Sequence, residues 1–208
     1  MRRMSSVADV RAESYGESGL TPVDRFGVWL SQRAIRPHVT PSCRVLDLGC
    51  GYDASLLRAL APQIASGTGI DVSVGPDARR IPGLAFAEGT LEETLPRIED
   101  DAYDLVCLIS VLEHVWEPID VLRECRRVLA PEGTLLINVP TWLGKGALEL
   151  SAFRLHTSPA IEMDDHKSYY DRRDLWPLLV RAGFAPHNIR LRRHKFGLNL
   201  FAVARRDA

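Results

Sequence analysis

The stretch that decides the fold is Val45-Leu46-Asp47-Leu48-Gly49-Cys50-Gly51, at residues 45–51. An apolar run that contains one acid, Asp47, ends at Gly49, and Gly51 follows after one residue. Residues 55–60 then show the spacing of a helix, which Pro62 ends. A strand, a glycine turn and a helix in this order begin a β-α-β unit. The unit predicts a parallel sheet, because parallel neighbours need crossover connections.

Strands and helices alternate along the rest of the chain. Short apolar runs predict further strands at 67–72, 84–87, 103–109 and 134–139, and Pro131-Glu132-Gly133 is expected to end the helix before the last of these. Two final strands, 189–194 and 198–204, are expected to form an antiparallel hairpin at the sheet edge. The predicted fold is α/β, with a mostly parallel seven-stranded sheet and helices on both faces.

Composition and length fit one domain. The 208 residues are 46% hydrophobic and 25% charged, close to the average of soluble globular proteins. We therefore expect residues 1–208 to form a single domain, with an N-terminal helical segment over 1–40. Residues 141–170 lack a sustained period and contain Gly144 and Gly146, so we expect an inserted segment that acts as a lid and shapes an acceptor site.

Charge and cysteine usage exclude several partners. Lys plus Arg is 26 against 27 for Asp plus Glu, so no strong field favours nucleic acid. The four cysteines form no C-x-x-C pair and have no His at zinc-site spacing, so no metal is expected.

The apolar run at 105–112 is too short for a membrane span, which takes about 20 residues. The first residues lack the apolar stretch of an export signal, so we expect a cytoplasmic protein with reduced thiols.

The glycine loop and two acids point to a nucleoside cofactor. Alone, Gly49-Cys50-Gly51-Tyr52-Asp53-Ala54 also satisfies the fingerprint for NAD. Asp71, however, ends the second strand 20 residues after Gly51, where a carboxylate accepts hydrogen bonds from a ribose diol. Asp47, at the lip of the predicted site, would repel a pyrophosphate and attract a sulfonium or ammonium group. S-adenosylmethionine combines a ribose with cationic centres and has no phosphate.

An ordered set of motifs carries a family resemblance from about Val45 to Phe184. The set comprises residues 45–51, Gly69-Ile70-Asp71-Val72-Ser73, Tyr103-Asp104-Leu105-Val106, Leu112-Glu113-His114-Val115, residues 127–133 and Ala182-Gly183-Phe184. With it the chain resembles the class I S-adenosylmethionine-dependent methyltransferases, especially the group acting on small molecules. The resemblance implies a Rossmann-like fold and S-adenosylmethionine as the cofactor.

The resemblance also implies roles for individual residues. Asp47, Gly49 and Gly51, with Cys50 between them, would hold the methionine portion. Asp71 would bind the ribose, Val72 would cover one adenine face, and Ser110 would face the cofactor across the cleft. Thr90 and Leu91 align where the family often has an acid for the adenine amine, and Glu88 or Glu92 is the alternative. Asp53 stands in place of a third glycine and is expected to cap the following helix, and Cys50 most simply packs as a small side chain.

The resemblance implies methyl transfer to a small molecule. Within residues 141–170, Asp164-Asp165-His166 and Tyr169-Tyr170 combine a possible base, an acid to orient it and aromatic walls, which favours transfer to oxygen of a hydroxylated acceptor, such as a glycan-type or lipid-linked one. A hydroxyl acceptor needs its proton removed, and His114 and His166 are the candidate bases. In the simpler interpretation, His114 and Glu113 begin a helix, where Glu113 complements the helix dipole, and His166 caps or pairs near the next helix. Two rival functions are a non-catalytic S-adenosylmethionine-binding scaffold and an NAD-dependent oxidoreductase, which Asp47 opposes.

Overall fold

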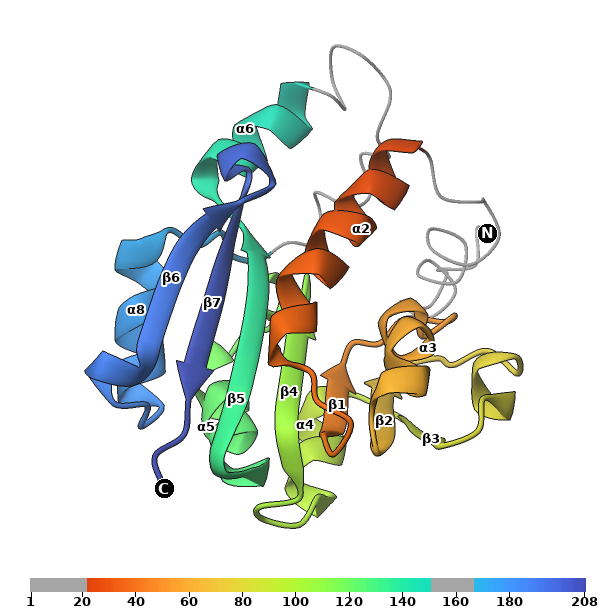
Figure 1. The fold of residues 1–208 in the computed structure, drawn as a ribbon. Coiled ribbons are helices and arrows are strands. Elements are labelled where there is room, and N and C mark those ends of the chain that lie inside the picture. The colour runs from red at the N-terminus through yellow and green to blue at the C-terminus, as the bar shows by residue number, and fades with distance from the viewer. Residues whose placement is uncertain (1–21, 151–166) are drawn as a thin grey trace, which may run out of the picture. The chain divides into compact units, whose positions relative to one another are not determined.

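The computed structural model describes residues 22–150 and 167–208. The chain divides into two compact units, residues 1–98 and 99–208. Together their strands follow the order β3-β2-β1-β4-β5-β7-β6. Figure 1 labels the elements along the chain.

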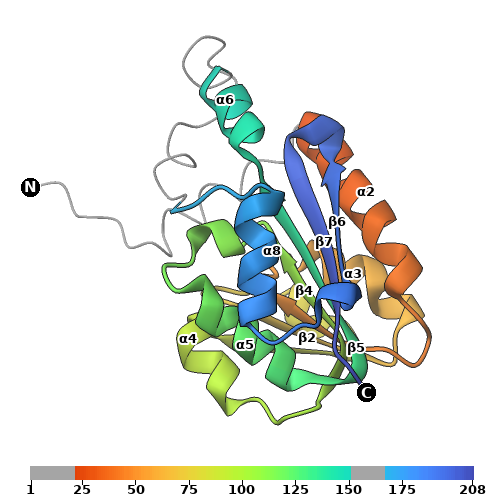
Figure 2. The same ribbon diagram turned by 90° about the vertical axis from the view of Figure 1, so that its left-hand side faces the viewer.

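The first unit is a parallel β-α-β arrangement. β1 (Arg44–Leu48) pairs with β2 (Ser66–Asp71), which pairs with β3 (Leu84–Glu88), all in the same direction. α3 (Ser55–Leu60) and α4 (Leu91–Thr94) both contact β2 and lie on opposite sides of the strands (Figure 2). α2 (Pro22–Ile35) precedes β1. The short 3-10 turns of this unit are η1 (Arg36–His38), η2 (Ala61–Gln63), η3 (Ala78–Arg80) and η4 (Leu95–Arg97).

The second unit adds the mixed part of the sheet. β4 (Tyr103–Ile109) runs parallel to β5 (Leu129–Pro140), whereas β7 (Asn199–Arg205) runs antiparallel to β5 and to β6 (Ile189–His194). α5 (Pro118–Val128) and α8 (Arg172–Arg181) pack together on one side of these strands (Figure 2). The remaining elements are α6 (Trp142–Leu150), η5 (Leu112–His114), η7 (Pro186–Asn188) and η8 (Lys195–Gly197).

The predicted fold class is confirmed, including the antiparallel C-terminal hairpin. Both units have apolar cores built from the alternating strands and helices, with Leu46 and Leu57 fully buried in the first and Leu108 and Phe201 in the second. In the described parts of the chain, no helix combines the length and the apolar character that crossing a bilayer requires. All four cysteines are buried and free of disulfides.

Three local predictions were wrong. α5 ends at Val128, before residues 131–133, because Leu129 already pairs with Tyr103 and β5 begins there. Asp53 does not cap α3: the N-cap position is Ala54, in a left-handed conformation without a side-chain cap. Residues 112–114 form a separate 3-10 turn, and α5 begins only at Pro118, whose fixed φ suits a first helical position.

Candidate functional site

The glycine loop after β1 is held against β2. Gly49 and Gly51 have φ of 71° and 74°, in the left-handed region that glycine adopts without strain. The backbone N–H groups of Gly49 and Cys50 donate to the Ile70 carbonyl at 2.8 and 3.1 Å. A Cβ added at Gly51 would meet no atom within 4 Å. The loop is thus fixed by β2 and leaves open space beside Gly51.

Asp71 is fixed in the same loop region. Its Oδ2 accepts from the Gly51 N–H at 2.8 Å, and its Oδ1 accepts from the Val72 N–H at 2.7 Å. Each carboxylate oxygen has a second lone pair after these bonds. The side chain is therefore oriented by two backbone donors and retains the capacity to accept two hydroxyl groups, as a ribose diol requires.

Asp47 is a buried acid two residues before Gly49. Only 2% of its surface is exposed. Burial, and then the neighbouring Asp71 carboxylate, raise the pKa of Asp47 to about 8. Because an uncompensated buried carboxylate is costly, a cationic ligand beside Asp47 would offset that cost and an anionic one would add to it. The first unit therefore fits S-adenosylmethionine, which presents a ribose diol and positive charge.

Cys50 and Thr90 have structural partners of their own. The Cys50 sulfur would lie 2.8 Å from a Cβ added at Gly69, so it packs against that glycine. Burial raises the pKa of the Cys50 thiol. The Thr90 hydroxyl accepts from the Glu93 N–H at 3.3 Å and caps α4, whose first residue is Leu91.

Of the two alternative acids near β3, Glu88 contacts the connection between β2 and β3. It accepts from the Val74 N–H at 2.8 Å and pairs with Arg79 at 2.8 Å. The Val74 hydrogen bond is the largest of the effects that lower the pKa of Glu88. Glu92 is exposed on α4. These contacts hold Glu88 ionised at the end of β3.

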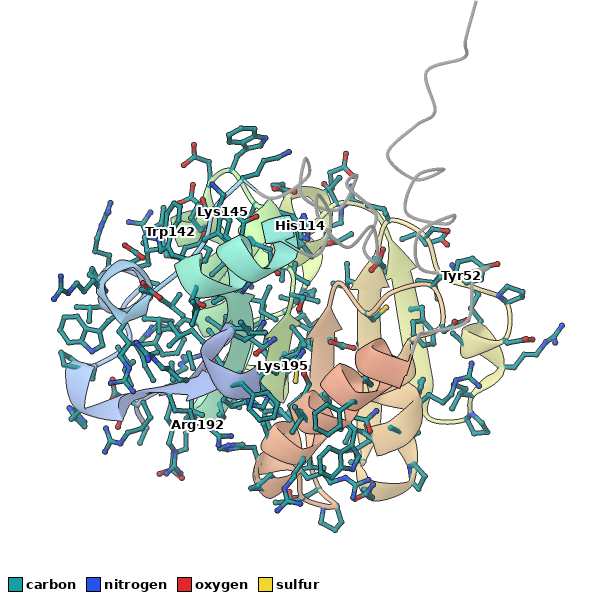
Figure 3. The ribbon with its side chains drawn as sticks, turned by 90° about the horizontal axis from the view of Figure 1, so that it is seen from above. Tyr52, His114, Trp142, Lys145, Arg192 and Lys195 are labelled. Atoms are coloured by element: carbon teal, nitrogen blue, oxygen red, sulfur yellow. The ribbon has the colours of Figure 1, made fainter. Side chains whose placement is uncertain are left out.

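Of the predicted site residues in the second unit, Ser110 and His114 are described. Ser110 has a φ of 58°, which is uncommon outside glycine, and its N–H donates to the Asn138 carbonyl at 2.8 Å. His114 lies on η5, is half-buried, and donates its backbone N–H to Val111 at 2.9 Å (Figure 3). His166 lies outside the described residues.

Two tyrosines before α8, Tyr169 and Tyr170, are buried. The ring of Tyr169 lies 5.5 Å from that of Trp142, and the Lys145 ammonium lies 5.7 Å from the centroid of each ring. The Tyr170 hydroxyl donates to the Leu112 carbonyl at 3.3 Å. Tyr169 and Tyr170 thus join the start of α6 and η5 to the segment before α8.

Glu113, which the sequence suggests only as a residue at the start of a helix, is a buried acid. It is 2% exposed, and burial raises its pKa to about 8, opposed by its own backbone N–H and by Lys195. Burial lowers the pKa of Lys195, which Glu113 raises in turn. The one available signal was an acid between the apolar residues Leu112 and Val115, all three of which are buried.

Comparison with known proteins identifies the family. The sequence matches the family described as "Methyltransferase domain" over residues 20–189, so the chain belongs to this family. A probable S-adenosylmethionine-dependent methyltransferase of Mycobacterium tuberculosis is 30% identical over 81% of this chain. The match covers 60% of that relative, so the chain spans about three fifths of its length.

Two further proteins resemble this chain, one in sequence and one in fold. The ubiquinone biosynthesis O-methyltransferase of Histophilus somni is 34% identical over 46% of this chain and 44% of its own length. A structure of an S-adenosylmethionine-dependent methyltransferase from Mesorhizobium loti superimposes with a TM-score of 0.67 at 18% identity, covering 86% of this chain and 97% of the other. The family match confirms the predicted class and its cofactor, S-adenosylmethionine. It does not support the alternative function, an NAD-dependent oxidoreductase.

Proposed function

We propose that this chain transfers the methyl group of S-adenosylmethionine to an oxygen atom of a hydroxylated small molecule or of a glycan-type or lipid-linked acceptor. The observation that carries the cofactor part of the proposal is the Asp71 carboxylate, oriented by the Gly51 and Val72 N–H groups next to the buried Asp47. The similarity to an O-methyltransferase of ubiquinone biosynthesis supports oxygen as the acceptor atom. The two units are proposed to work as one methyltransferase domain, since the family match spans both.

The residues of the first unit have distinct binding roles in this proposal. Gly49, Cys50 and Gly51 allow close approach of the methionine portion, and Asp47 balances its positive charge. Asp71 accepts the ribose hydroxyls, and Val72, with Thr90 and Leu91, lines the adenine side. The cofactor supplies a methyl group already activated by a sulfonium. The protein contributes chiefly by holding the acceptor and the methyl group in a reactive geometry.

An alcohol acceptor adds one requirement, the removal of its proton. Ser110 and His114 follow β4 in the second unit. His114 and His166 are proposed proton acceptors because an imidazole has a pKa near neutrality. A base in this role contributes about 10²–10⁴ in rate.

The experiment that tests the proposal incubates the chain with methyl-labelled S-adenosylmethionine and a metabolite extract. Labelled product whose methyl group is identified by mass spectrometry as a methyl ether or ester is expected. A chain that binds the cofactor by calorimetry but labels no fraction would favour the non-catalytic scaffold. Label found on nitrogen or carbon would contradict transfer to oxygen.

A further inference from the structure

The second unit holds buried polar atoms without hydrogen-bond partners. Among buried side-chain atoms of the described residues, four lack a partner: Glu113 Oε2, Asn138 Nδ2, Asn138 Oδ1 and His194 Nε2. Asn138 is fully buried and Glu113 nearly so. An unmatched buried polar group is unfavourable, and most have partners in native proteins. These atoms retain hydrogen-bonding capacity that a polar ligand could satisfy.

The sheet register brings these residues to one end of the second unit. Asn138 pairs with Ile109, the last residue of β4, and with Phe201 of β7. The His194 ring lies 5.6 Å from the Phe201 ring. Glu113 lies on η5, which follows β4 and contacts β5. This is the carboxyl end of β4 and β5, the end at which α/β sheets bind ligands.

The backbone of Glu113 is anchored by a segment far along the chain. Its carbonyl accepts from the Lys167 N–H at 2.7 Å and from the Ser168 N–H at 3.2 Å. Tyr170 donates its N–H to the Pro140 carbonyl at 3.0 Å and its hydroxyl to Leu112. Residues 167–170 therefore tie η5 to the end of β5 and fix the position from which the Glu113 carboxyl projects.

We propose that Glu113, in place of His114 or His166, is the catalytic base of the second unit, the group that hydrogen-bonds the hydroxyl of the methyl acceptor and takes its proton. The inference rests on the proposed methyl transfer to oxygen. As the bond from the acceptor oxygen to the methyl carbon forms, the carbon–sulfur bond breaks and its electron pair stays on sulfur. The hydroxyl proton passes to the Glu113 carboxylate, which becomes a neutral carboxyl and later releases the proton to solvent.

The electrostatic surroundings of Glu113 suit this role. Burial raises its pKa to about 8, which lies close to the pH at which a base works best. The charged or titratable groups that act on it are Lys195 of η8 and Tyr170 of the anchoring segment. Figure 3 shows Lys195 at the turn between β6 and β7. Lys195 favours the ionised carboxylate, so it is a positioning residue that limits the rise in the pKa of Glu113 caused by burial.

The decisive variant is Glu113→Gln, because glutamine keeps the shape of the protonated carboxyl and cannot take a proton. The probes are catechol, whose hydroxyls need a base, and 4-nitrocatechol, whose acidic hydroxyl is ionised near neutral pH without help. We expect Glu113→Gln to lower turnover of catechol by about 10²–10⁴-fold, and that of 4-nitrocatechol far less. Calorimetry should give the same S-adenosylmethionine affinity as the unaltered chain.

Two controls complete the assay. Glu117→Gln removes an exposed carboxyl nearby and should leave both turnovers unchanged. His114→Gln removes the neighbouring imidazole. If His114→Gln loses catechol turnover and Glu113→Gln retains it, the histidine is the base and the inference is wrong. If the unaltered chain binds S-adenosylmethionine but methylates neither probe nor any fraction of the metabolite extract, the proposed function fails, whereas methylation that Glu113→Gln leaves intact refutes only the assignment of the base.

A readout independent of turnover is the titration of Glu113 itself. Carboxyl carbon-13 resonances of labelled glutamate are compared between the unaltered chain and Glu113→Gln, which identifies the Glu113 signal. We expect this signal to titrate near pH 8 and to move to higher pH in Lys195→Met, because the variant removes a nearby cation. Titration near an ordinary glutamate pKa of about 4.3 would mean that the carboxyl is solvated, and would overturn the inference.

Discussion

Asp47 and Glu113 share one property at the scale of single residues: each is a buried carboxyl whose pKa is raised to about 8. Desolvation is the main cause in both, and each has one principal charged neighbour. For Asp47 this is Asp71, which opposes ionisation, whereas for Glu113 it is Lys195, which favours it. In the proposed roles, the same burial suits Asp47 to a cationic ligand and Glu113 to the exchange of a proton.

Asp47→Asn tests the first of these roles. With a pKa of about 8, Asp47 is largely neutral in the ligand-free chain at pH 7, and a bound cation favours its ionised form. Asparagine keeps the size of the side chain but cannot ionise, so the variant should weaken binding of S-adenosylmethionine by about 1.5–3 kcal/mol, the range for a hydrogen bond to a charged group. Binding of S-adenosylhomocysteine, whose sulfur is neutral, should weaken less. Calorimetric titration of both ligands measures the difference, and equal losses would mean that Asp47 acts on the amino group that the two ligands share.

The proposed cofactor residues can be chosen from the sequence alone because their spacing is local. Asp47, Gly49 and Gly51 lie in one turn, and the distance to Asp71 is one β-α-β crossover. Glu113 could not be found in this way. Its surroundings depend on hydrogen bonds from Lys167 and Ser168 and on the charge of Lys195, all far along the chain.

At the scale of elements, the start of α6 is tied to η8. The Thr141 hydroxyl donates to the Gly197 carbonyl at 2.8 Å and accepts from the Gly144 N–H at 3.0 Å. A Cβ added at Gly144 would clash with the Leu198 carbonyl oxygen. Glycine at this position is thus required by close approach of two backbones, a reason separate from the movable lid that the sequence predicts.

Two glycines of α6 form a matched pair for a stability test. Gly144→Ala should lower the free energy of unfolding by about 1–3 kcal/mol, because it overpacks a close contact. At Gly146, an added Cβ would meet nothing within 4 Å. Gly146→Ala should therefore be neutral or stabilise the helix by about 0.5–1 kcal/mol. Urea unfolding measures both, and equal effects would contradict the contact between Gly144 and Leu198.

Element positions were more predictable than element ends. The strand at 103–109 and the helix at 55–60 have the predicted bounds, since apolar runs and Pro62 mark them. The end of α5 could not be predicted, because Leu129 leaves the helix to pair with Tyr103 and Thr134 resumes the ladder opposite Leu105. Glu132, at a φ of 64°, lies in the irregular stretch between them.

At the scale of the whole molecule, the two buried acids make stability depend on pH. A carboxyl with a raised pKa binds its proton more tightly in the folded chain, so its contribution is fully present below the unfolded pKa of about 4 and is lost as pH rises to about 8. His194 acts oppositely: its pKa is lowered to about 4, so its contribution is lost as pH falls from about 6.5.

Between pH 6.5 and 8 only the acids of this set titrate, so the ligand-free chain should become less stable across this window. Glu113→Gln should flatten the dependence, because it removes one of the two groups. Thermal or urea unfolding at a series of pH values measures the slope. A Glu113→Gln slope identical to that of the unaltered chain would show that Glu113 titrates alike in the folded and unfolded states.

The central claim is that the chain binds S-adenosylmethionine with Asp71 as the ribose ligand. It is tested most directly by calorimetric titration of S-adenosylmethionine and NADH into the unaltered chain, Asp71→Ala and the surface control Asp77→Asn. We predict binding of S-adenosylmethionine and not of NADH, a loss of about 2–4 kcal/mol in Asp71→Ala from two charge-assisted hydrogen bonds, and no loss in Asp77→Asn. Preferential binding of NADH, or an unchanged affinity in Asp71→Ala, would contradict the claim.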